Sequence, residues 1–379
     1  MDKVFKYELF NKMIRDFAVN EVKPLAHEVD EQERFPYETV EKMAKLGLMG
    51  IIVPKEYGGM GGDYKMYIKA VEELSKVCAT TGVILSAHTS LCIAPIMEYG
   101  NEEQKKKYLP KLASGEWLGA FGLTEPNAGT DANNQTTTAV KEGDHWVLNG
   151  SKIFITNAGP ANVYFVIAVT GRNPKGVECA AFIVEKGFPG FSVGKKELKM
   201  GIRGSSTCEL IFENCIVPEA NLVGKIGEGV KMALKTLDGG RVGISAQALG
   251  IAEGALEATG AYVKERKQFN KPISAFQNTQ FCLADLYTKI NAASLLVERA
   301  TEAKQNKSPM LGMYAAQAKL FAAETAMEVT TKCVQLHGGY GYTREYPVER
   351  MMRDAKITEI YEGTSEVQRM VISGALLKK

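Results

Sequence analysis

Apolar residues recur with helical spacing in the first third of the chain. One such face carries Phe10, Met13, Ile14, Phe17 and Ala18. This spacing is the 3.6-residue period of an amphipathic helix. A glycine-rich loop at 57–62 interrupts the pattern, and another helix is expected to start near residue 63. Residues 1–118 are therefore predicted to form a helical domain.

The pattern changes between residues 119 and 223, where short apolar runs of strand length alternate with glycine and proline. Such runs lie at 163–169, 180–184 and 209–212. Asn149-Gly150 stands between two further apolar runs and is typical of a two-residue hairpin turn, because both residues tolerate positive φ. Residues 119–223 are predicted to form a small antiparallel β domain, either a sandwich or a barrel.

Helical periodicity returns from residue 224 to residue 379. Long periodic runs at 278–306 and 310–336, with a terminal helix after residue 364, predict a C-terminal four-helix bundle. The expected fold class is α+β, mainly α, with three domains: a helical domain (1–118), a β domain (119–223) and a helical bundle (224–379).

Composition limits the classes of function. The chain has 379 residues, 45% hydrophobic and 24% charged, with a net charge of +2, so it lacks the strongly basic character of a nucleic-acid-binding protein. No apolar stretch of membrane-spanning length is expected, and the first residues do not resemble a secretory signal. Seven dispersed cysteines and four separated histidines predict reduced thiols, a cytoplasmic location and no metal site.

The segment 360–366 places Glu362 in a short loop flanked by apolar residues, just before a helix start. Ser365 and Gln368 have the spacing of a capping box. Burial in such a loop would raise the pKa of the carboxylate toward working pH, which suits a general base that takes a proton from carbon. A solvated loop glutamate is the simpler interpretation of this segment alone.

Other segments combine a structural with a functional interpretation. The double glycine at 239–240 lies inside a helical pattern, so it indicates a helix break, tight helix packing or room for a ligand. The turn 122–131 and the strand 154–157 would let a polar, flat ligand approach, or would simply be a loop and a core strand. Segment 265–272 is either a charged helix end stopped by Pro272 or a phosphate site built on Arg266.

Together and in this order, these segments resemble the acyl-CoA dehydrogenase family over nearly the whole chain. The resemblance rests on TEPNAGTD (124–131), FITN (154–157), LDGGR (237–241), ERKQF (265–269), QLHGGYGY (335–342) and IYEGTSE (360–366). It is strongest to bacterial short-chain members of the butyryl-CoA type. It implies a homotetramer, one non-covalent FAD per subunit, an acyl-CoA substrate and electron exchange with electron-transferring flavoprotein.

The resemblance also implies site residues. Glu362 occupies the position of the catalytic base, and Gly240 stands where some relatives carry the base instead, so branched-chain and long-chain relatives fit less well. The implied FAD contacts are Phe121, Leu123, Thr124, Gly129, Thr130, Phe154, Ile155, Thr156, Arg266, Phe269, Gln277, Gln335, Gly338, Gly339, Thr364, Ser365 and Glu366. The implied substrate contacts are Thr130, Asp238, Gly239, Gly240, Arg241 and Gly363.

The implied reaction is α,β-dehydrogenation of a short-chain acyl-CoA to the trans-2-enoyl-CoA, or its reverse. Glu362 would remove the pro-R α-proton while the β-hydride passes to flavin N5. Hydrogen bonds from the Glu362 N–H and a flavin ribityl hydroxyl would stabilise the developing enolate. The alternatives are a reductase of another 2-enoyl-CoA (acryloyl- or caffeyl-type), an acyl-CoA oxidase, and a non-catalytic helical binding protein.

Overall fold

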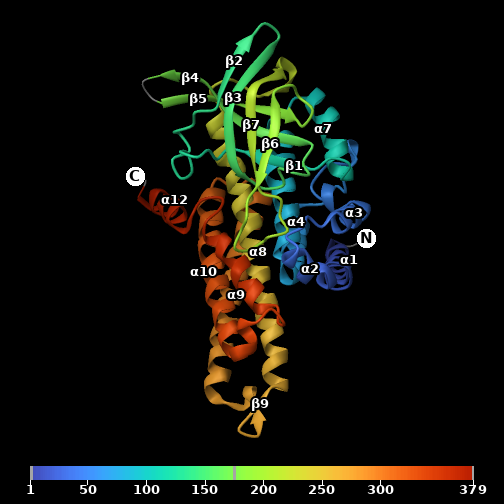
Figure 1. Cartoon of the computed structure of the whole chain (residues 1–379), viewed down its shortest axis with the longest axis vertical. Helices are drawn as coiled ribbons and strands as arrows, with labels where there is room; N and C mark the ends of the chain where they lie inside the picture. Colours follow the sequence, from blue (N-terminus) through green and yellow to red (C-terminus); the bar gives the residue numbers. More distant parts are fainter. Residues whose placement is uncertain (1–2, 174–175, 378–379) are drawn as a thin grey trace.

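The structure is a computed structural model that describes residues 3–173 and 176–377. A helical part, a β part and a helical bundle follow one another along the chain (Figure 1). The β part lies at one end of the long axis, and the long C-terminal helices run away from it toward the other end. The N-terminal helices cover one side of this junction. The predicted domain boundaries fall between α7 and β1 and between β8 and α8.

From residue 3 on, where the described residues begin, the N-terminal part contains seven α-helices. They are α1 (Lys3–Phe17), α2 (Ala26–Glu31), α3 (Tyr37–Lys45), α4 (Tyr64–Val77), α5 (Ala79–Ser86), α6 (Ala94–Tyr99) and α7 (Glu102–Ser114). The Asp63 side chain caps α4 by accepting a hydrogen bond from the Met66 N–H at 3.1 Å. The helix predicted to start near residue 63 therefore begins there, with an aspartate cap.

The run Ala79–Tyr99 corrects one prediction. Its 21 residues are helical and apolar enough to span a membrane by length and composition, although no such stretch was expected. However, 89% of its most apolar window is buried inside the protein. The run consists of α5, the π-helical stretch Ala87–Ile93 and α6, and it packs on β1 and α8. Its apolar character on every side is therefore explained by burial in the core.

The β part is one eight-stranded sheet. Its strands are β1 (Gly119–Gly122), β2 (Thr138–Glu142), β3 (His145–Ile155), β4 (Val163–Asn173), β5 (Gly176–Glu185), β6 (Phe191–Lys196), β7 (Cys208–Pro218) and β8 (Leu222–Val223). The order is β6-β7-β3-β2-β4-β5-β8, with β1 paired to β4. Most pairs are antiparallel as expected, but β1 and β2 each pair with β4 in parallel.

Strand β4 shows how the sheet joins the helices. Val163, Phe165 and Ile167 pack in the large core shared with the helices, whereas Tyr164 and Val166 pack in a second core inside the β part. Both faces are buried, so the strand reads as a continuous apolar run without alternation. Core packing on both faces fixes the β part on the helical junction.

The predicted hairpin turn at Asn149-Gly150 was wrong. Strand β3 runs through both residues, and the turn into it lies one segment earlier, where Glu142 of β2 pairs with His145. Gly150 instead marks a bulge against β7, with a φ of 137°. A Cβ at this position would lie 2.7 Å from the Thr137 backbone, so the close approach of a neighbouring strand requires the glycine.

The C-terminal part contains α8 (Gly229–Glu265), α9 (Gln277–Gln305), α10 (Leu311–His337), α11 (Val348–Lys356) and α12 (Ser365–Leu377). Helix α8 continues through Gly239-Gly240, so the helix break considered for these residues does not occur. The helix also ends at Glu265 and not at Pro272. A two-stranded hairpin, β9 (Lys267–Gln268) and β10 (Lys271–Pro272), follows it.

Candidate active site

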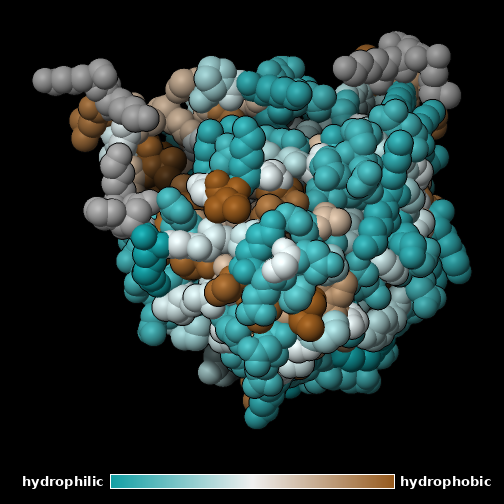
Figure 2. Space-filling view, turned by 90° about the horizontal axis from the view of Figure 1, so that it is seen from above, coloured by the Kyte–Doolittle hydropathy of each residue, from teal (hydrophilic) through white to brown (hydrophobic). Residues whose placement is uncertain are grey.

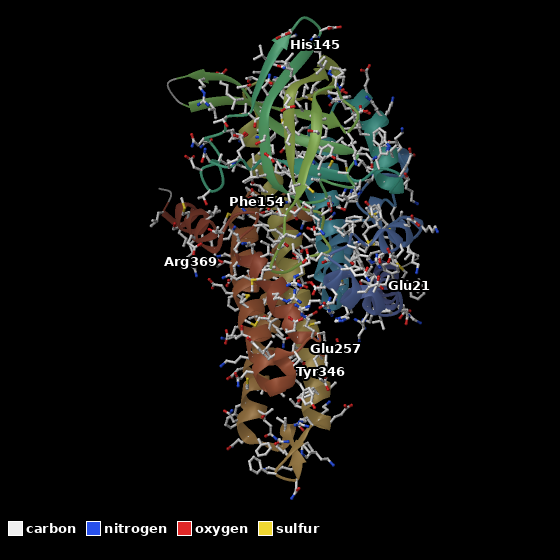
Figure 3. All side chains as sticks on the ribbon, viewed as in Figure 1. Glu21, His145, Phe154, Glu257, Tyr346 and Arg369 are labelled. Atoms are coloured by element: carbon white, nitrogen blue, oxygen red, sulfur yellow. The ribbon has the colours of Figure 1, made fainter. Side chains whose placement is uncertain are left out.

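A cavity of about 660 Å³ lies where the β part meets the helices. Its walls come from the end of β1 with the loop after it (121–132), the end of β3 (153–156), the segment 197–202, the start of α8 and the tail 360–364. Val83, Ala87 and Leu91 close it from the buried run of the N-terminal part. Figure 3 places Phe154, one of its lining residues, at the junction of the β part and the bundle.

Glu362 lies in the wall of this cavity on a strained turn. Its φ is 53° and that of Gly363 is 91°, both in the left-handed region. This conformation costs a non-glycine residue about 1–2 kcal/mol, so surrounding contacts must maintain it. The Oε2 atom of Glu362 is buried and has no hydrogen-bond partner among the described residues. The turn therefore presents an unpaired carboxylate oxygen.

The electrostatic environment of Glu362 favours its neutral form. Burial raises the pKa of the carboxyl to about 8, although the positive charges of Arg241 and Lys319 oppose that rise. A low-dielectric surrounding disfavours a charge that water would otherwise solvate. The pKa near 8 suits a base that works close to neutral pH.

Several donors hold the carbonyl groups of this turn. Arg241 Nε donates to the Glu362 carbonyl at 3.4 Å and Gln368 Nε2 donates to it at 3.3 Å. The Gly363 carbonyl accepts from Gln368 Nε2 at 2.7 Å and from Lys319 Nζ at 2.8 Å. The Glu362 N–H makes no hydrogen bond within the described residues. The carbonyls are therefore anchored, and one N–H remains a free donor beside the carboxylate.

Gly240 explains why the carboxylate can occupy its place. A Cβ built on Gly240 would lie 1.9 Å from Glu362 Oε2 and 2.9 Å from Leu91 Cδ2. Any side chain here would overlap the carboxylate. The room left by this glycine is thus taken by Glu362. Gly239 faces Lys304 instead, whose Nζ lies 3.5 Å from a Cβ built there.

The capping box predicted for Ser365 and Gln368 was wrong. Thr364 precedes α12, its carbonyl accepts from the Gln368 N–H at 3.0 Å and its Oγ1 accepts from the Val367 N–H at 3.4 Å. Ser365 is already the first residue of the helix. The Gln368 side chain is occupied by the carbonyls of Glu362 and Gly363, and it cannot serve the helix terminus as well.

A buried ion pair supports the loop 121–132 from below. Lys152 Nζ, which is fully buried, donates to Glu125 Oε1 at 2.7 Å, to the Leu123 carbonyl at 3.1 Å and to Gln135 Oε1 at 2.9 Å. Burial opposes ionisation of Glu125, but Lys152 and the donors of Thr136 hold its pKa at about 2. This ion pair fixes the backbone that lines the cavity.

The structure brings many of the predicted site residues to this one cavity. Its lining includes Phe121, Leu123, Thr124, Gly129, Thr130, Phe154, Ile155, Thr156, Arg241, Glu362, Gly363 and Thr364. Asp238, Gly239, Gly240, Ser365 and Glu366 do not line it. Asp238 pairs instead with Arg241 Nη1 at 2.8 Å, so it orients a lining residue from outside the cavity.

A second cavity of about 490 Å³ lies at the far end of α8. Of the predicted residues, Arg266, Gln335, Gly338 and Gly339 line it, and Arg266 lies over the Tyr340 ring at 5.4 Å. Phe269 and Gln277 line neither cavity, and Phe269 is 89% exposed at the tip of the β9–β10 hairpin. Figure 1 shows this hairpin at the end of the bundle remote from the β part.

The main cavity fits the isoalloxazine part of FAD. Phe154 adopts a φ of 58° and is 61% exposed, so its ring faces the cavity without packing in the core. The hydroxyls of Thr124 and Thr156 lie in the same wall. Seen from above, apolar side chains gather in patches on a mostly hydrophilic surface (Figure 2). A flat apolar ligand with polar edges suits a cavity lined by an aromatic ring and hydroxyl groups.

Several residues of the site were missed from the sequence. Lys319 and Gln368 contact the Glu362–Gly363 turn, and Lys152 contacts the segment 121–132. Each of the three lies within an ordinary helical or strand pattern. A charged residue in an otherwise apolar stretch, as at Lys152 and Lys319, was the available signal. Only the fold shows which atom each of them binds.

Three family models match the chain. The N-terminal, middle and C-terminal domains of acyl-CoA dehydrogenase match residues 6–116, 120–215 and 227–377. Two relatives are an acyl-CoA dehydrogenase described as short-chain specific from Clostridium acetobutylicum and an acryloyl-CoA reductase (NADH) from Anaerotignum propionicum. The first is 62% identical over 98% of each chain. The second is 50% identical over 98% of this chain and 94% of the relative.

Solved structures agree with these matches. Butyryl-CoA dehydrogenase from Megasphaera elsdenii is 51% identical, with a TM-score of 0.95 over 98% of each chain. A chain from a structural study of the electron transferring flavoprotein of Acidaminococcus fermentans is 54% identical, also with a TM-score of 0.95 over 98% of each chain. Sequence and fold therefore agree over almost the whole length, and the chain belongs to the acyl-CoA dehydrogenase family.

Proposed function

We propose that this flavoenzyme interconverts a short-chain acyl-CoA and its trans-2-enoyl-CoA, with Glu362 as the catalytic base. The observation that carries the proposal is the position of the Glu362 carboxylate. Its Oε2 is buried and unpaired, lies against Gly240, and belongs to the wall of a cavity that suits a flavin. A base that removes a proton from carbon requires this kind of desolvated, free oxygen.

The carboxylate and the backbone N–H of Glu362 have different roles in the proposed reaction. The Glu362 carboxylate accepts the α-proton, and the free Glu362 N–H is available for the thioester carbonyl, where negative charge develops. Donors on both turn carbonyls hold this N–H and the carboxylate in a fixed relation. FAD, the cofactor of this family, supplies the hydride acceptor. Leu91 and the Phe154 ring give the wall of the cavity apolar surface.

The separation of the two cavities supports an oligomer. Arg241 and Arg266 lie at opposite parts of α8, about 37 Å apart at 1.5 Å per residue. One FAD molecule cannot reach both groups within the same subunit. We infer that Arg266, Gln335, Gly338 and Gly339 bind the pyrophosphate and adenosine of an FAD held by another copy, as a homotetramer would allow.

The electron partner and location are also proposed. The similar chain from the study of an electron transferring flavoprotein supports such a flavoprotein as the electron partner here. All seven cysteines are free thiols, which supports a reducing, cytoplasmic location. In the described residues, no group of three or more His, Cys, Asp or Glu side chains is placed to hold a metal ion.

The reverse reaction is the second candidate. Acryloyl-CoA reductase (NADH) from Anaerotignum propionicum is similar over nearly the whole chain, which favours an enoyl-CoA reductase as the alternative. The same residues serve this direction, since protonated Glu362 can return the proton to the α-carbon. The geometry of the base is common to both directions, so kinetics must distinguish them.

The test is anaerobic flavin bleaching by a panel of acyl-CoAs, with enoyl-CoA reduction measured alongside. We expect butyryl-CoA to bleach the flavin fastest, and acryloyl- and caffeyl-type substrates to be reduced slowly or not at all. Fast reduction of acryloyl-CoA would favour the second candidate. Rapid oxygen uptake with butyryl-CoA would indicate an oxidase. A colourless protein that cannot be reconstituted with FAD would refute the assignment.

A further inference from the structure

Lys319 brings a buried positive charge to the turn of Glu362, and the proposed mechanism uses only its hydrogen bond. It lies in the first half of α10 and is fully buried. An ammonium group taken out of water costs several kcal/mol unless it is paired, so its burial requires a compensating contact. Its Nζ donates to the Gly363 carbonyl at 2.8 Å, one residue beyond the base.

The contact acts on the backbone that orients Glu362. The Gly363 carbonyl accepts two donors from different helices, Lys319 Nζ of α10 and Gln368 Nε2 of α12 at 2.7 Å. The two residues of this turn are left-handed, and a glutamate does not adopt that conformation without support. Losing one donor would free the turn and move the carboxylate away from Gly240.

Lys319 differs from Gln368 in its charge. The charged groups that influence Glu362 are Arg241 of α8 and Lys319. Glu362 in turn raises the pKa of the buried hydroxyls of Tyr67 of α4 and Tyr361 beside it. The charged groups that influence Lys319 are Glu362, Arg241, Glu359 and Glu366. Burial lowers the pKa of Lys319 to about 8, and the charge of Glu362 opposes this. The ammonium therefore stabilises the ionised base as well as the turn.

We propose that Lys319 is a positioning residue of the catalytic base, which holds the Gly363 carbonyl and stabilises the ionised form of Glu362 by its charge. The proposal rests on the proposed function of Glu362. It predicts two separable effects. Anchoring is shared with Gln368, whereas the effect of charge belongs to Lys319.

Three variants separate these effects. Lys319→Met removes the anchor and the charge, Gln368→Met removes an anchor from the same carbonyl without changing the charge, and Lys289→Met removes an exposed lysine of α9 that pairs with Glu328. For each FAD-loaded variant, the rate of anaerobic flavin bleaching at saturating butyryl-CoA is measured from pH 6 to pH 10. Flavin content and the apparent dissociation constant for butyryl-CoA are measured in parallel.

We expect both anchor variants to bleach about 10–100-fold more slowly, because a misoriented base loses its alignment. Only Lys319→Met should move the inflection of the pH profile, by about one unit to higher pH, since a neighbouring positive charge is lost. Lys289→Met should match the wild type. The dissociation constant should stay within about threefold for all three variants, because none of these groups lines the cavity.

An unmoved inflection in Lys319→Met, or an equal movement in Gln368→Met, would overturn the proposal. If Lys319→Met does not retain FAD, Lys319→Gln is measured in its place. Loss of FAD from both variants would assign Lys319 to the folded core and would also overturn it. Failure of the wild type to bleach with any acyl-CoA would refute the proposed function instead, so the two failures are distinguishable.

Discussion

Replacing Glu362 by glutamine should abolish turnover and, at the same time, stabilise the protein at high pH. Glutamine keeps the shape of the side chain and removes its charge. The structure buries the carboxylate against Gly240 without a hydrogen-bond partner for Oε2 among the described residues. Burial of this ionisable group therefore lowers the free energy of unfolding, and the variant should have a higher one.

The size of the recovery follows from the pKa. Burial raises the pKa of Glu362 from 4.5 to about 8, and this difference corresponds to about 5 kcal/mol. Below pH 4.5 the carboxyl is protonated in both folded and unfolded states, so no penalty exists. Between pH 4.5 and pH 8 the unfolded state ionises while the folded state does not, and stability falls. Above pH 8 the penalty is complete. Glutamine does not ionise, so the variant has no such penalty at any pH.

The assay compares melting temperatures of FAD-loaded wild type and Glu362→Gln from pH 5 to pH 9. The two should differ least at pH 5, and the variant should melt at progressively higher temperature than the wild type as the pH rises. Glu345→Gln, the same change at an exposed glutamate, is the matched control and should show no such trend. Flavin bleaching by butyryl-CoA should fall at least about 10³-fold in the Glu362 variant.

Two results would refute this reasoning. A melting difference that is the same at pH 5 and pH 9 would show that the carboxylate is not desolvated in the folded protein. Near-normal bleaching in Glu362→Gln would show that another group takes the proton. Retention of yellow FAD in the variant is the check that the cavity itself is intact.

Three further predictions concern the surroundings of the base. Gly240→Ala should reduce turnover at least about 100-fold, because its Cβ would lie 1.9 Å from the Glu362 carboxylate, the proposed base. Gly260→Ala, in open space on α8, should leave turnover unchanged and add up to about 1 kcal/mol of stability; equal turnover in the two variants would contradict this prediction. Lys152→Met should lower the free energy of unfolding by about 3–5 kcal/mol in urea titrations, since it leaves the buried Glu125 carboxylate without a positive partner, and an unchanged midpoint would refute this prediction. Arg266→Ala should weaken FAD binding about 10–100-fold in equilibrium titrations. An FAD affinity equal to that of the wild type would show that Arg266 does not belong to the proposed pyrophosphate site.

The sequence by itself predicted the order of the parts, and its motifs single out Glu362 as the candidate base. Helical periodicity before residue 119 and after residue 224, with strand-length runs between, depends on local spacing and survives in the structure. Local turn chemistry was less reliable. Asn149-Gly150 has the composition of a hairpin turn, but pairing with β7 and the contact with Thr137 make it a bulge.

Only the tertiary structure decided how the site works. In the sequence, Glu362 and Gly240 belong to separate motifs 122 positions apart. The fold places the Glu362 carboxylate in the space that a side chain at position 240 would occupy. It also brings Lys319, Gln368 and Arg241 from three helices onto the carbonyls of one turn. Periodicity and motif spacing report local preferences. The pKa of the base and the strain of its turn arise from contacts between distant segments, which exist only after the chain has packed.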